Sequence, residues 1–145
     1  MKKMMSILFL LFIVFASTAS ANYRWQDTGI HSKNIVSNLS FDTKSFMKTG
    51  DKTYSVWIKM QYIEEYGKKL AKDLDLSISV SYCVSKEEYN YTNQTFRDLS
   101  YTYYDEEGNS LYTSNRPSDW INIIPDSIGE AKFMVTYDYY EKYHK

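Results

Sequence analysis

Apolar and polar residues alternate over several short segments of this chain, which is the pattern of half-buried β-strands. The alternation predicts strands at residues 35–41, 53–62, 76–84, 95–104 and 110–114, and an aromatic segment at residues 23–28 adds a first, short one. Residues 86–92 either continue the strand before them or form a polar edge. A polar stretch at residues 48–52, with Gly50 inside it, predicts a hairpin loop.

Two segments depart from this period of two. Between residues 62 and 74 a Tyr or Leu recurs at every fourth position, which predicts a short amphipathic helix over residues 63–75. Gly67 lies in its middle and weakens a helix by about 1 kcal/mol relative to alanine. A connecting loop is therefore the alternative for this segment.

The second departure is a helix start after Pro125. Asp126 or Ser127 can accept hydrogen bonds from the free amides of a first turn, and Ser127 with Glu130 has the spacing of a capping box. The face expected to pack against the sheet is the stripe Ile128, Ala131, Met134, Val135 and Asp138. The chain therefore predicts an α+β, mainly β fold, in which an antiparallel sheet is covered by a C-terminal helix.

The first residues have the composition of a secretory signal peptide. Lys2 and Lys3 precede an apolar run at residues 7–16, and Ala19-Ser20-Ala21 forms a small-residue cleavage site. The run is about half of the ~20 residues that a membrane-spanning helix needs, so a retained anchor is the weaker alternative. We expect residues 1–21 to be removed after about Ala21, leaving residues 22–145 as a single domain that is secreted to the periplasm or cell surface without a stable membrane anchor.

Charge and composition narrow the function further. Beyond residue 21 the chain has 15 basic and 18 acidic residues and no basic stripe, which argues against a nucleic-acid partner. Tyrosine is abundant, with 15 residues. Tyrosine packs well on pleated strands, and it also provides binding surfaces with large contact area at low entropic cost, so both uses stay open.

Cys83 is the only cysteine of the sequence, and an odd thiol in an exported protein needs an explanation. Alternation places it on the serine-bearing face of its strand, away from Val84. It is then either a small packed residue or the link of a disulfide-bonded homodimer. Neither His31 nor His144 lies in a context that would make Cys83 a nucleophile.

Acidic residues give no sign of catalysis or of metal binding. Asp105, Glu106 and Glu107 are consecutive and precede a glycine, which is a hairpin turn rather than the alternating ligand pattern of a calcium loop. Asp126 and Glu130 are explained by helix capping and the helix dipole. We therefore expect no enzymatic activity, no cofactor and no metal site.

Aromatic residues near the hairpin form the best candidate for a binding surface, because aromatics are enriched at interfaces. The candidates are Tyr101, Tyr103, Tyr104, Tyr112 and Trp120. Alternation places Tyr101 and Tyr103 on one face and Tyr104 on the other, and core packing is the alternative use for either set.

Taken in order, several motifs resemble those of the surface-adhesin protein E family of small exported bacterial proteins. They are Trp25 near the expected mature start, D-x-x-S at residues 42–45, V-W-I-K at 56–59, Y-C-V-S-K at 82–86, Y-Y-D-E-E-G-N at 103–109 and W-I-N-I-I-P-D-S-I-G-E at 120–130. The resemblance implies a six-stranded antiparallel sheet, curved like part of a barrel and packed by the terminal helix. It also implies an envelope or surface location and adhesion to host matrix proteins.

One feature departs from the family pattern. Family members typically carry a second cysteine near the chain end that fastens the helix to the middle strand, and here residues 135–138 read V-T-Y-D. The helix must then dock by burial alone. We expect a non-enzymatic adhesion domain whose partner is a host extracellular-matrix or envelope protein. The alternative is a periplasmic structural or interaction module, chaperone-like or inhibitory, with no adhesive role.

Overall fold

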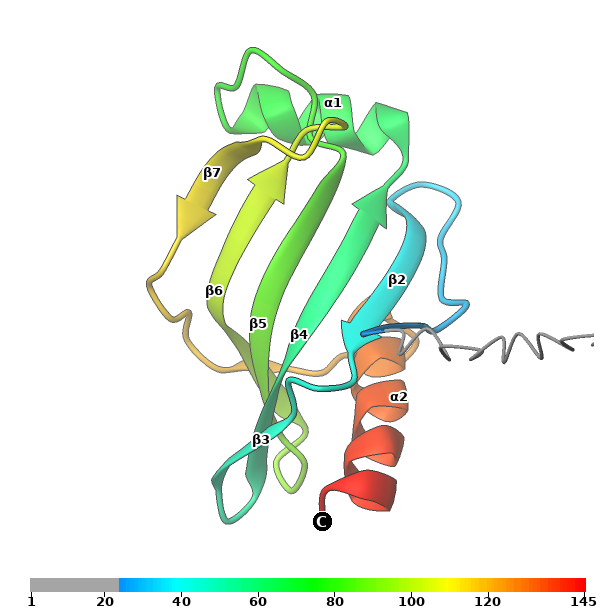
Figure 1. Cartoon of the computed structure of the whole chain (residues 1–145), viewed down its shortest axis with the longest axis vertical. Helices are drawn as coiled ribbons and strands as arrows, with labels where there is room; N and C mark the ends of the chain where they lie inside the picture. Colours follow the sequence, from blue (N-terminus) through cyan, green and yellow to red (C-terminus); the bar gives the residue numbers. More distant parts are fainter. Residues whose placement is uncertain (1–23) are drawn as a thin grey trace, which may run out of the picture.

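A computed structural model describes residues 24–145, and the predicted signal peptide and its cleavage site lie outside this range. The described part holds a mainly antiparallel sheet and two helices (Figure 1). The elements are β1 (Trp25–Asp27), β2 (Val36–Asp42), β3 (Met47–Gly50), β4 (Thr53–Tyr62), α1 (Glu64–Asp73), β5 (Tyr82–Asn90), β6 (Thr95–Tyr104), β7 (Ser110–Ser114), β8 (Ile121–Asn122) and α2 (Ile128–Tyr143).

The sheet is open, and its main strands are ordered β1-β2-β4-β5-β6-β7 with antiparallel pairing throughout. Two further short strands extend it: β3 pairs with the start of β4, and β8 pairs with the start of β6. The predicted six main strands with a covering C-terminal helix are therefore confirmed. The polar stretch at residues 48–52 is the turn of the β3–β4 hairpin, as expected, although β3 itself was not predicted.

The strand predicted over residues 76–84 begins later than expected, because β5 spans Tyr82–Asn90. Of the two alternatives for residues 86–92, continuation of the strand is confirmed as far as Asn90. Residues 76–81 instead connect α1 to the sheet, where the Val80 amide donates to the Gly67 carbonyl at 3.3 Å. Charged residues can lie inside β5 because Glu87 and Glu88 each meet a cation from another element, Lys132 and Arg97 respectively.

A β-bulge divides β6 into two parts. Lys86 of β5 pairs with Ser100, but the next β5 residue, Glu87, pairs with Asp98, which leaves Leu99 as an extra residue in β6. An extra residue reverses the alternation of side chains beyond it. Asp98 and Tyr101 therefore point to the same face of the sheet, although one is an even-numbered and the other an odd-numbered position.

Helix α1 confirms the helix predicted over residues 63–75. Its central Gly67 lies against the chain that leads into β5, and a Cβ atom at this position would approach the Val80 carbonyl oxygen to 2.0 Å. The glycine that weakens the helical pattern is thus required by the close contact between the helix and the following segment. The loop alternative is wrong.

Helix α2 begins with the predicted cap. Ser127 is the N-cap residue, and its Oγ accepts a hydrogen bond from the Glu130 amide at 3.1 Å. The Glu130 carboxylate reaches back to accept from the Asp126 amide at 2.8 Å. Asp126 does not cap the helix itself; it occupies the turn before it, with φ of 60°.

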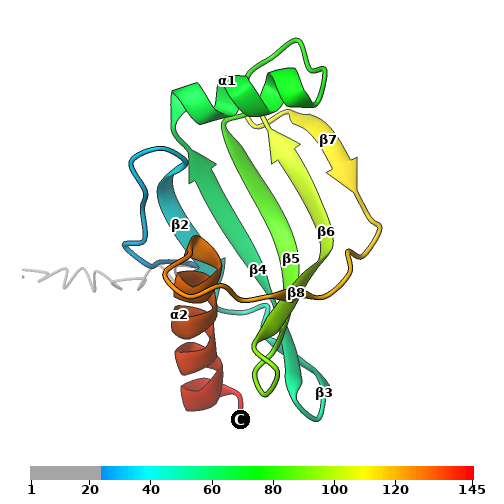
Figure 2. The same cartoon turned by 180° about the vertical axis from the view of Figure 1, so that it is seen from behind.

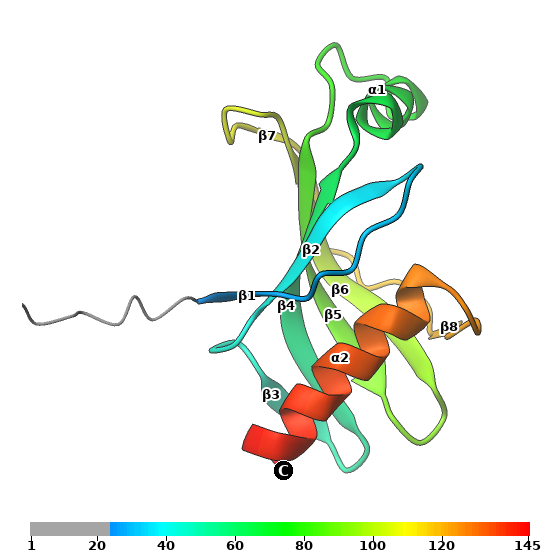
Figure 3. The ribbon, with the colours of Figure 1, turned by 90° about the vertical axis from the view of Figure 1, so that its right-hand side faces the viewer.

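Helix α2 runs along one face of the sheet (Figure 3), but it packs by a different side from the predicted one. Met134, expected inside, is 57% exposed. The fully buried side chains of the helix are Lys132, Phe133, Thr136 and Tyr140, while Ile128 and Val135 pack at the margin of the core. A search for purely apolar residues misjudged the face because Lys132 and Thr136 have polar partners inside.

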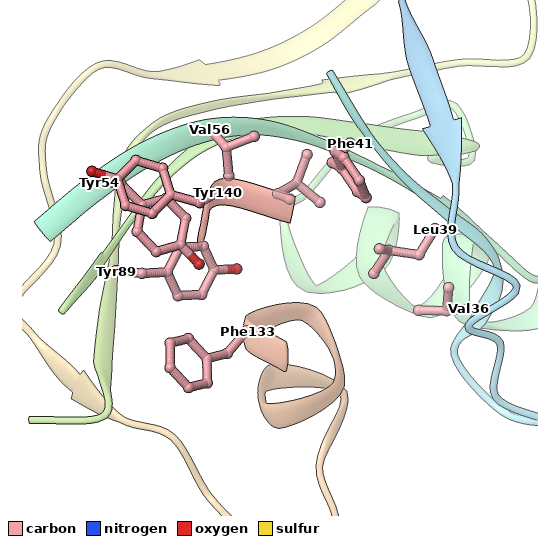
Figure 4. Packing of buried hydrophobic residues seen from close by; sticks show 9 residues of the cluster. Val36, Leu39, Phe41, Tyr54, Val56, Tyr89, Phe133 and Tyr140 are labelled. Atoms are coloured by element: carbon pink, nitrogen blue, oxygen red, sulfur yellow. The ribbon is translucent and has the colours of Figure 1, made fainter. Parts of the chain in front are cut away.

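Stacked aromatic rings join α2 to the sheet (Figure 4). Tyr54 of β4 lies between Tyr89 of β5 and Tyr140 of α2, with ring centroids 5.4 and 4.5 Å apart. The Tyr54 hydroxyl forms a buried hydrogen bond with Thr136 Oγ1 at 2.9 Å. These contacts, together with Phe133 and the apolar residues of β2 and β4, hold the helix without a disulfide.

Candidate functional site

One part of the sheet face that carries α2 has no helix over it. Seen from behind, α2 lies below β2 and beside the lower part of β4, where Tyr140 stacks on Tyr54, and α1 crosses the far end of the sheet (Figure 2). The stretch between the two helices is formed by the end of β4, the start of β5, the second part of β6, and β7. We call it the open half of this face, and the part under α2 the covered half.

Tyrosines from four elements meet on the open half. Tyr66 of α1 is next to Tyr62 of β4, Tyr62 is next to Tyr103 of β6, and Tyr101 and Tyr112 lie beyond. Adjacent ring centroids are 5.2 Å (Tyr66–Tyr62), 6.5 Å (Tyr62–Tyr103), 5.3 Å (Tyr103–Tyr101) and 6.1 Å (Tyr101–Tyr112) apart. We call these five residues the tyrosine row.

Three hydroxyl groups of the row stay protonated at physiological pH. Burial raises the pKa of Tyr62, Tyr101 and Tyr103 above the ordinary phenol value. Each of these side chains therefore offers a neutral O–H donor and an apolar ring edge at physiological pH. Tyr112, at the outer end, is 42% exposed.

A cavity of about 320 Å³ lies beneath the row, between β4–β6 and the start of α2. Its lining includes Tyr62, Tyr101 and Tyr103 of the row, and it also includes the charged side chains Glu87, Asp98 and Lys132. The cavity thus combines aromatic and charged lining residues.

Two of the charged lining residues, Lys132 and Glu87, form a buried ion pair with its own hydrogen bonds. Lys132 Nζ donates to Glu87 Oε1 at 2.7 Å, and both side chains are more than nine-tenths buried. The Glu87 carboxylate also accepts from Ser85 Oγ at 3.0 Å and from the Tyr89 hydroxyl. A buried carboxylate with this many donors is satisfied, so the pair contributes little free charge to the cavity.

Asp98 differs from Glu87 because its carboxylate has no such partner. Within residues 24–145, no side chain or amide donates a hydrogen bond to this carboxylate, whereas the Asp98 backbone amide donates to Ser118 Oγ at 3.1 Å and the Asp98 carbonyl accepts from the Ser118 amide at 2.9 Å. Burial, and secondarily the Glu87 charge, raises the pKa of Asp98 to about 6, while Lys132 acts in the opposite direction.

Comparison with protein families identifies the family of this chain. The sequence matches the family described as surface-adhesin protein E over residues 25–136, which is most of the described chain. The chain belongs to the surface-adhesin protein E family. No curated protein matches it. Family membership indicates an exported surface protein related to adhesion.

In this adhesin E family member, Cys83 is buried in β5 rather than exposed for pairing. Its side chain is 6% exposed, and burial raises the pKa of the thiol to about 12. A disulfide between two folded copies would therefore have to reach a buried thiol. The homodimer stays a prediction, and a Cys83 link is a poor route to it.

The predicted aromatic cluster is only partly brought together. Tyr101, Tyr103 and Tyr112 lie in the tyrosine row. Tyr104 lies on the opposite face, where its ring stacks on Tyr82 at 4.8 Å. Trp120 is also apart from the row: it is 40% exposed and packs against the Arg97 guanidinium at 4.7 Å.

Two members of the row, Tyr62 and Tyr66, were not among the predicted site residues. They were used only as evidence for a helix, because they are four positions apart. Their place in the row follows from the sheet order, which sets β4 two strands from β6, and from the position of α1 over the sheet end. A local pattern contains neither of these facts.

Asp105, the first acidic residue of the predicted hairpin turn, has a structural role. The Asp105 carboxylate accepts hydrogen bonds from the Asn109 amide at 2.7 Å and from its side chain at 2.8 Å, and so closes the β6–β7 turn. Within the described range, no three His, Cys, Asp or Glu side chains converge as metal ligands would. Neither α1 nor α2 is long and apolar enough to cross a membrane.

Proposed function

We propose that this protein is a non-enzymatic binding domain of the bacterial envelope or surface, and that the tyrosine row is its contact surface for a host extracellular-matrix or envelope protein. Family membership supports the adhesion-related role. The observation that carries the choice of surface is the row itself, which joins side chains of β4, α1, β6 and β7.

The row has the physical properties of a contact surface. Tyrosine rings provide large areas at small entropic cost, and their hydroxyls can bond to a partner's backbone. Neighbouring rings and the sheet backbone restrict their motion, so little further ordering is required when a partner binds. Tyrosine is also among the residues enriched at the centres of protein interfaces.

The absence of enzymatic activity is supported by the surroundings of the possible catalytic groups. The Cys83 thiol is buried, with its pKa raised. His144 stacks on Phe46 at the far end of α2, and His31 Nδ1 contacts the Gly29 carbonyl. Within the described residues these groups do not meet as a nucleophile and base.

Alanine substitutions in the row test the proposal. Tyr101→Ala and Tyr112→Ala are expected to weaken binding to immobilised matrix proteins at least about tenfold each, as interface tyrosines commonly do. Tyr104→Ala is the matched control, because it lies on the same hairpin but on the opposite face. Equal binding by all three variants and the wild type would reject the row as the contact surface.

Fractionation of cells distinguishes adhesion from the alternative role. An adhesin is expected at the cell surface, and its deletion strain should adhere less to matrix-coated surfaces than the parent. Accumulation in the periplasm alone, with unchanged adhesion, would favour a periplasmic structural or interaction module.

A further inference from the structure

The cavity below the tyrosine row is a site separate from the row's outer surface. It is bounded by β4, β5 and β6 and closed on one side by the first turns of α2, which supply Lys132. Its volume of about 320 Å³ is at the lower end of the range for small-molecule sites. A ligand of a few heavy atoms would fit beneath Tyr101 and Tyr103 without displacing either helix.

The charges around the cavity leave one anion without a partner. From β5 come Glu87 and the protonated thiol of Cys83, from α2 comes Lys132, and from β6 comes Asp98. Glu87 and Lys132 neutralise each other at 2.7 Å. The remaining formal charge is that of the Asp98 carboxylate, to which no described side chain donates a hydrogen bond.

The walls favour a cation for a second reason. Aromatic faces attract cations, and Tyr62, Tyr101 and Tyr103 present rings to the cavity from two strands. The protein already uses this interaction nearby, since Lys132 Nζ lies 5.0 Å from the Phe96 ring centroid. An anionic ligand would instead meet the unpaired Asp98 charge and the negative ring faces, because the Lys132 ammonium of the lining is already paired with Glu87.

We propose that this cavity binds a primary alkylammonium group, with the ammonium on the Asp98 carboxylate and the alkyl chain against the tyrosine rings. The ammonium has three N–H donors, which suit the two free carboxylate oxygens and a tyrosine hydroxyl. A short alkyl chain replaces water along the apolar part of the wall, where Met60 contributes its thioether side chain. The proposal does not depend on whether the outer row binds a matrix protein.

Two sources could supply this chemistry: a free amine, or the lysine side chain of a bound polypeptide. Butylammonium chloride represents the first, and N-acetyl-lysine methylamide represents the second. Binding of both would indicate that a lysine side chain can enter from a polypeptide, while binding of butylammonium alone would indicate a site for free amines. Either result supports an ammonium site.

Titration of the folded protein with these two probes, followed by amide and tyrosine-ring NMR shifts, tests the proposal. We expect saturable shifts at Asp98, Tyr101 and Tyr103, and an Asp98→Asn affinity at least about tenfold weaker. Asp51→Asn is the matched control, since Asp51 is exposed in the β3–β4 turn and does not line the cavity. Thermal melts of both variants establish that they fold.

A neutral probe keeps the test decisive if Asp98→Asn does not fold. Butanol has the same chain length and lacks the charge, so it should shift the same signals at least about tenfold more weakly than butylammonium. The proposal is overturned if butanol and butylammonium bind equally, if Asp98→Asn folds and binds butylammonium as the wild type does, or if neither probe gives saturable shifts.

Discussion

The covered and open halves of one sheet face use the same residue in opposite ways. Under α2, Tyr54 and Tyr89 are fully buried and Tyr140 is 3% exposed. In the open half, Tyr101 and Tyr112 have a similar ring spacing but remain in contact with solvent. Both sets include tyrosines from strands of the same antiparallel sheet, so the strand sequence alone does not decide which tyrosines become core.

The difference lies in the partners of the hydroxyl groups. In the covered half, the Tyr54 hydroxyl bonds with Thr136 and the Tyr89 hydroxyl donates to Glu87. A buried phenol is stable only with such a partner, and α2 together with the centre of β5 supplies it. Where no helix covers the sheet, the partners come from neighbouring strands: Tyr112 and Ser114 for the Tyr101 hydroxyl, and Cys83 for the Tyr62 hydroxyl.

The largest expected difference in unfolding free energy is between removing a tyrosine ring from the covered half and removing one from the open half. Tyr140→Ala should reduce the free energy of unfolding by roughly 3–5 kcal/mol, because it leaves a cavity beside Tyr54 and Tyr89. Tyr112→Ala, in the open half, should change it by roughly 0.5 kcal/mol or less. Denaturant unfolding measures both, and similar losses would contradict the division into two halves.

Breaking the buried ion pair should rank next. Lys132→Met leaves the Glu87 carboxylate buried without its ammonium, and we expect a loss of about 3 kcal/mol in unfolding free energy. Adding Glu87→Gln should restore part of this loss, because an uncharged amide is less costly to bury.

A solvent-exposed ion pair provides the control for that experiment. Lys69 and Asp73 of α1 are 3.0 Å apart but largely exposed, so Lys69→Met should cost less than about 1 kcal/mol. If Lys132→Met were as stable as Lys69→Met, the expected cost of leaving the Glu87 carboxylate buried without its ammonium would be contradicted.

A smaller effect should follow from the hydrogen bond between the helix and the sheet. Thr136→Val keeps the shape of the side chain but leaves the Tyr54 hydroxyl without its partner at 2.9 Å, which should cost roughly 1–2 kcal/mol. Thr136→Ser retains the hydroxyl and should preserve the bond. Equal stability of the valine and serine variants would contradict this account of how α2 docks.

The smallest effect concerns how the Asp98 carboxyl group makes the stability of the protein depend on pH. The Asp98 pKa is raised from 3.8 to about 6 in the folded protein, so the native state binds a proton more tightly than the unfolded chain does. The contribution of the Asp98 carboxyl group to the unfolding free energy is therefore fully present below about pH 4, and it is lost as the pH rises toward 6.

Asp98→Asn removes this dependence. After allowance for solvent screening at a half-buried carboxyl, the variant should exceed the wild type by roughly 1 kcal/mol at neutral pH, with a smaller difference in acid. Thermal melts across this range measure it, and a difference that is constant with pH would contradict the assignment.

Most of the sheet could be predicted from the sequence because its alternation is local. The bounds of β4, β6 and β7 agree with the expected strands, and the Ser127 cap follows from four consecutive residues. Strand β5 could not be placed in this way. Its charged centre could equally continue the strand or form a polar edge, and the choice depends on Lys132, 45 residues away, which pairs with Glu87.

The packing face of α2 and the full tyrosine row depend on the same kind of distant contact. Met134 reads as core and Thr136 as surface in any scale of hydropathy, yet the structure reverses them because Tyr54 provides a partner for Thr136. Tyr101, Tyr103 and Tyr112 were predictable because one hairpin contains them. Tyr62 and Tyr66 reach the site only through the order of strands and the position of α1.

The extra residue Leu99 gives β6 two halves in opposite phase, and this makes the site depend on chain length as well as on composition. Loss of one residue at the bulge would leave every tyrosine in the sequence and yet turn Tyr101 and Tyr103 toward the face that Tyr104 now occupies. Insertions and deletions at this point are therefore a route by which related chains could gain or lose the surface in a single step. An alignment of relatives that places a gap here would join chains whose tyrosines face opposite sides.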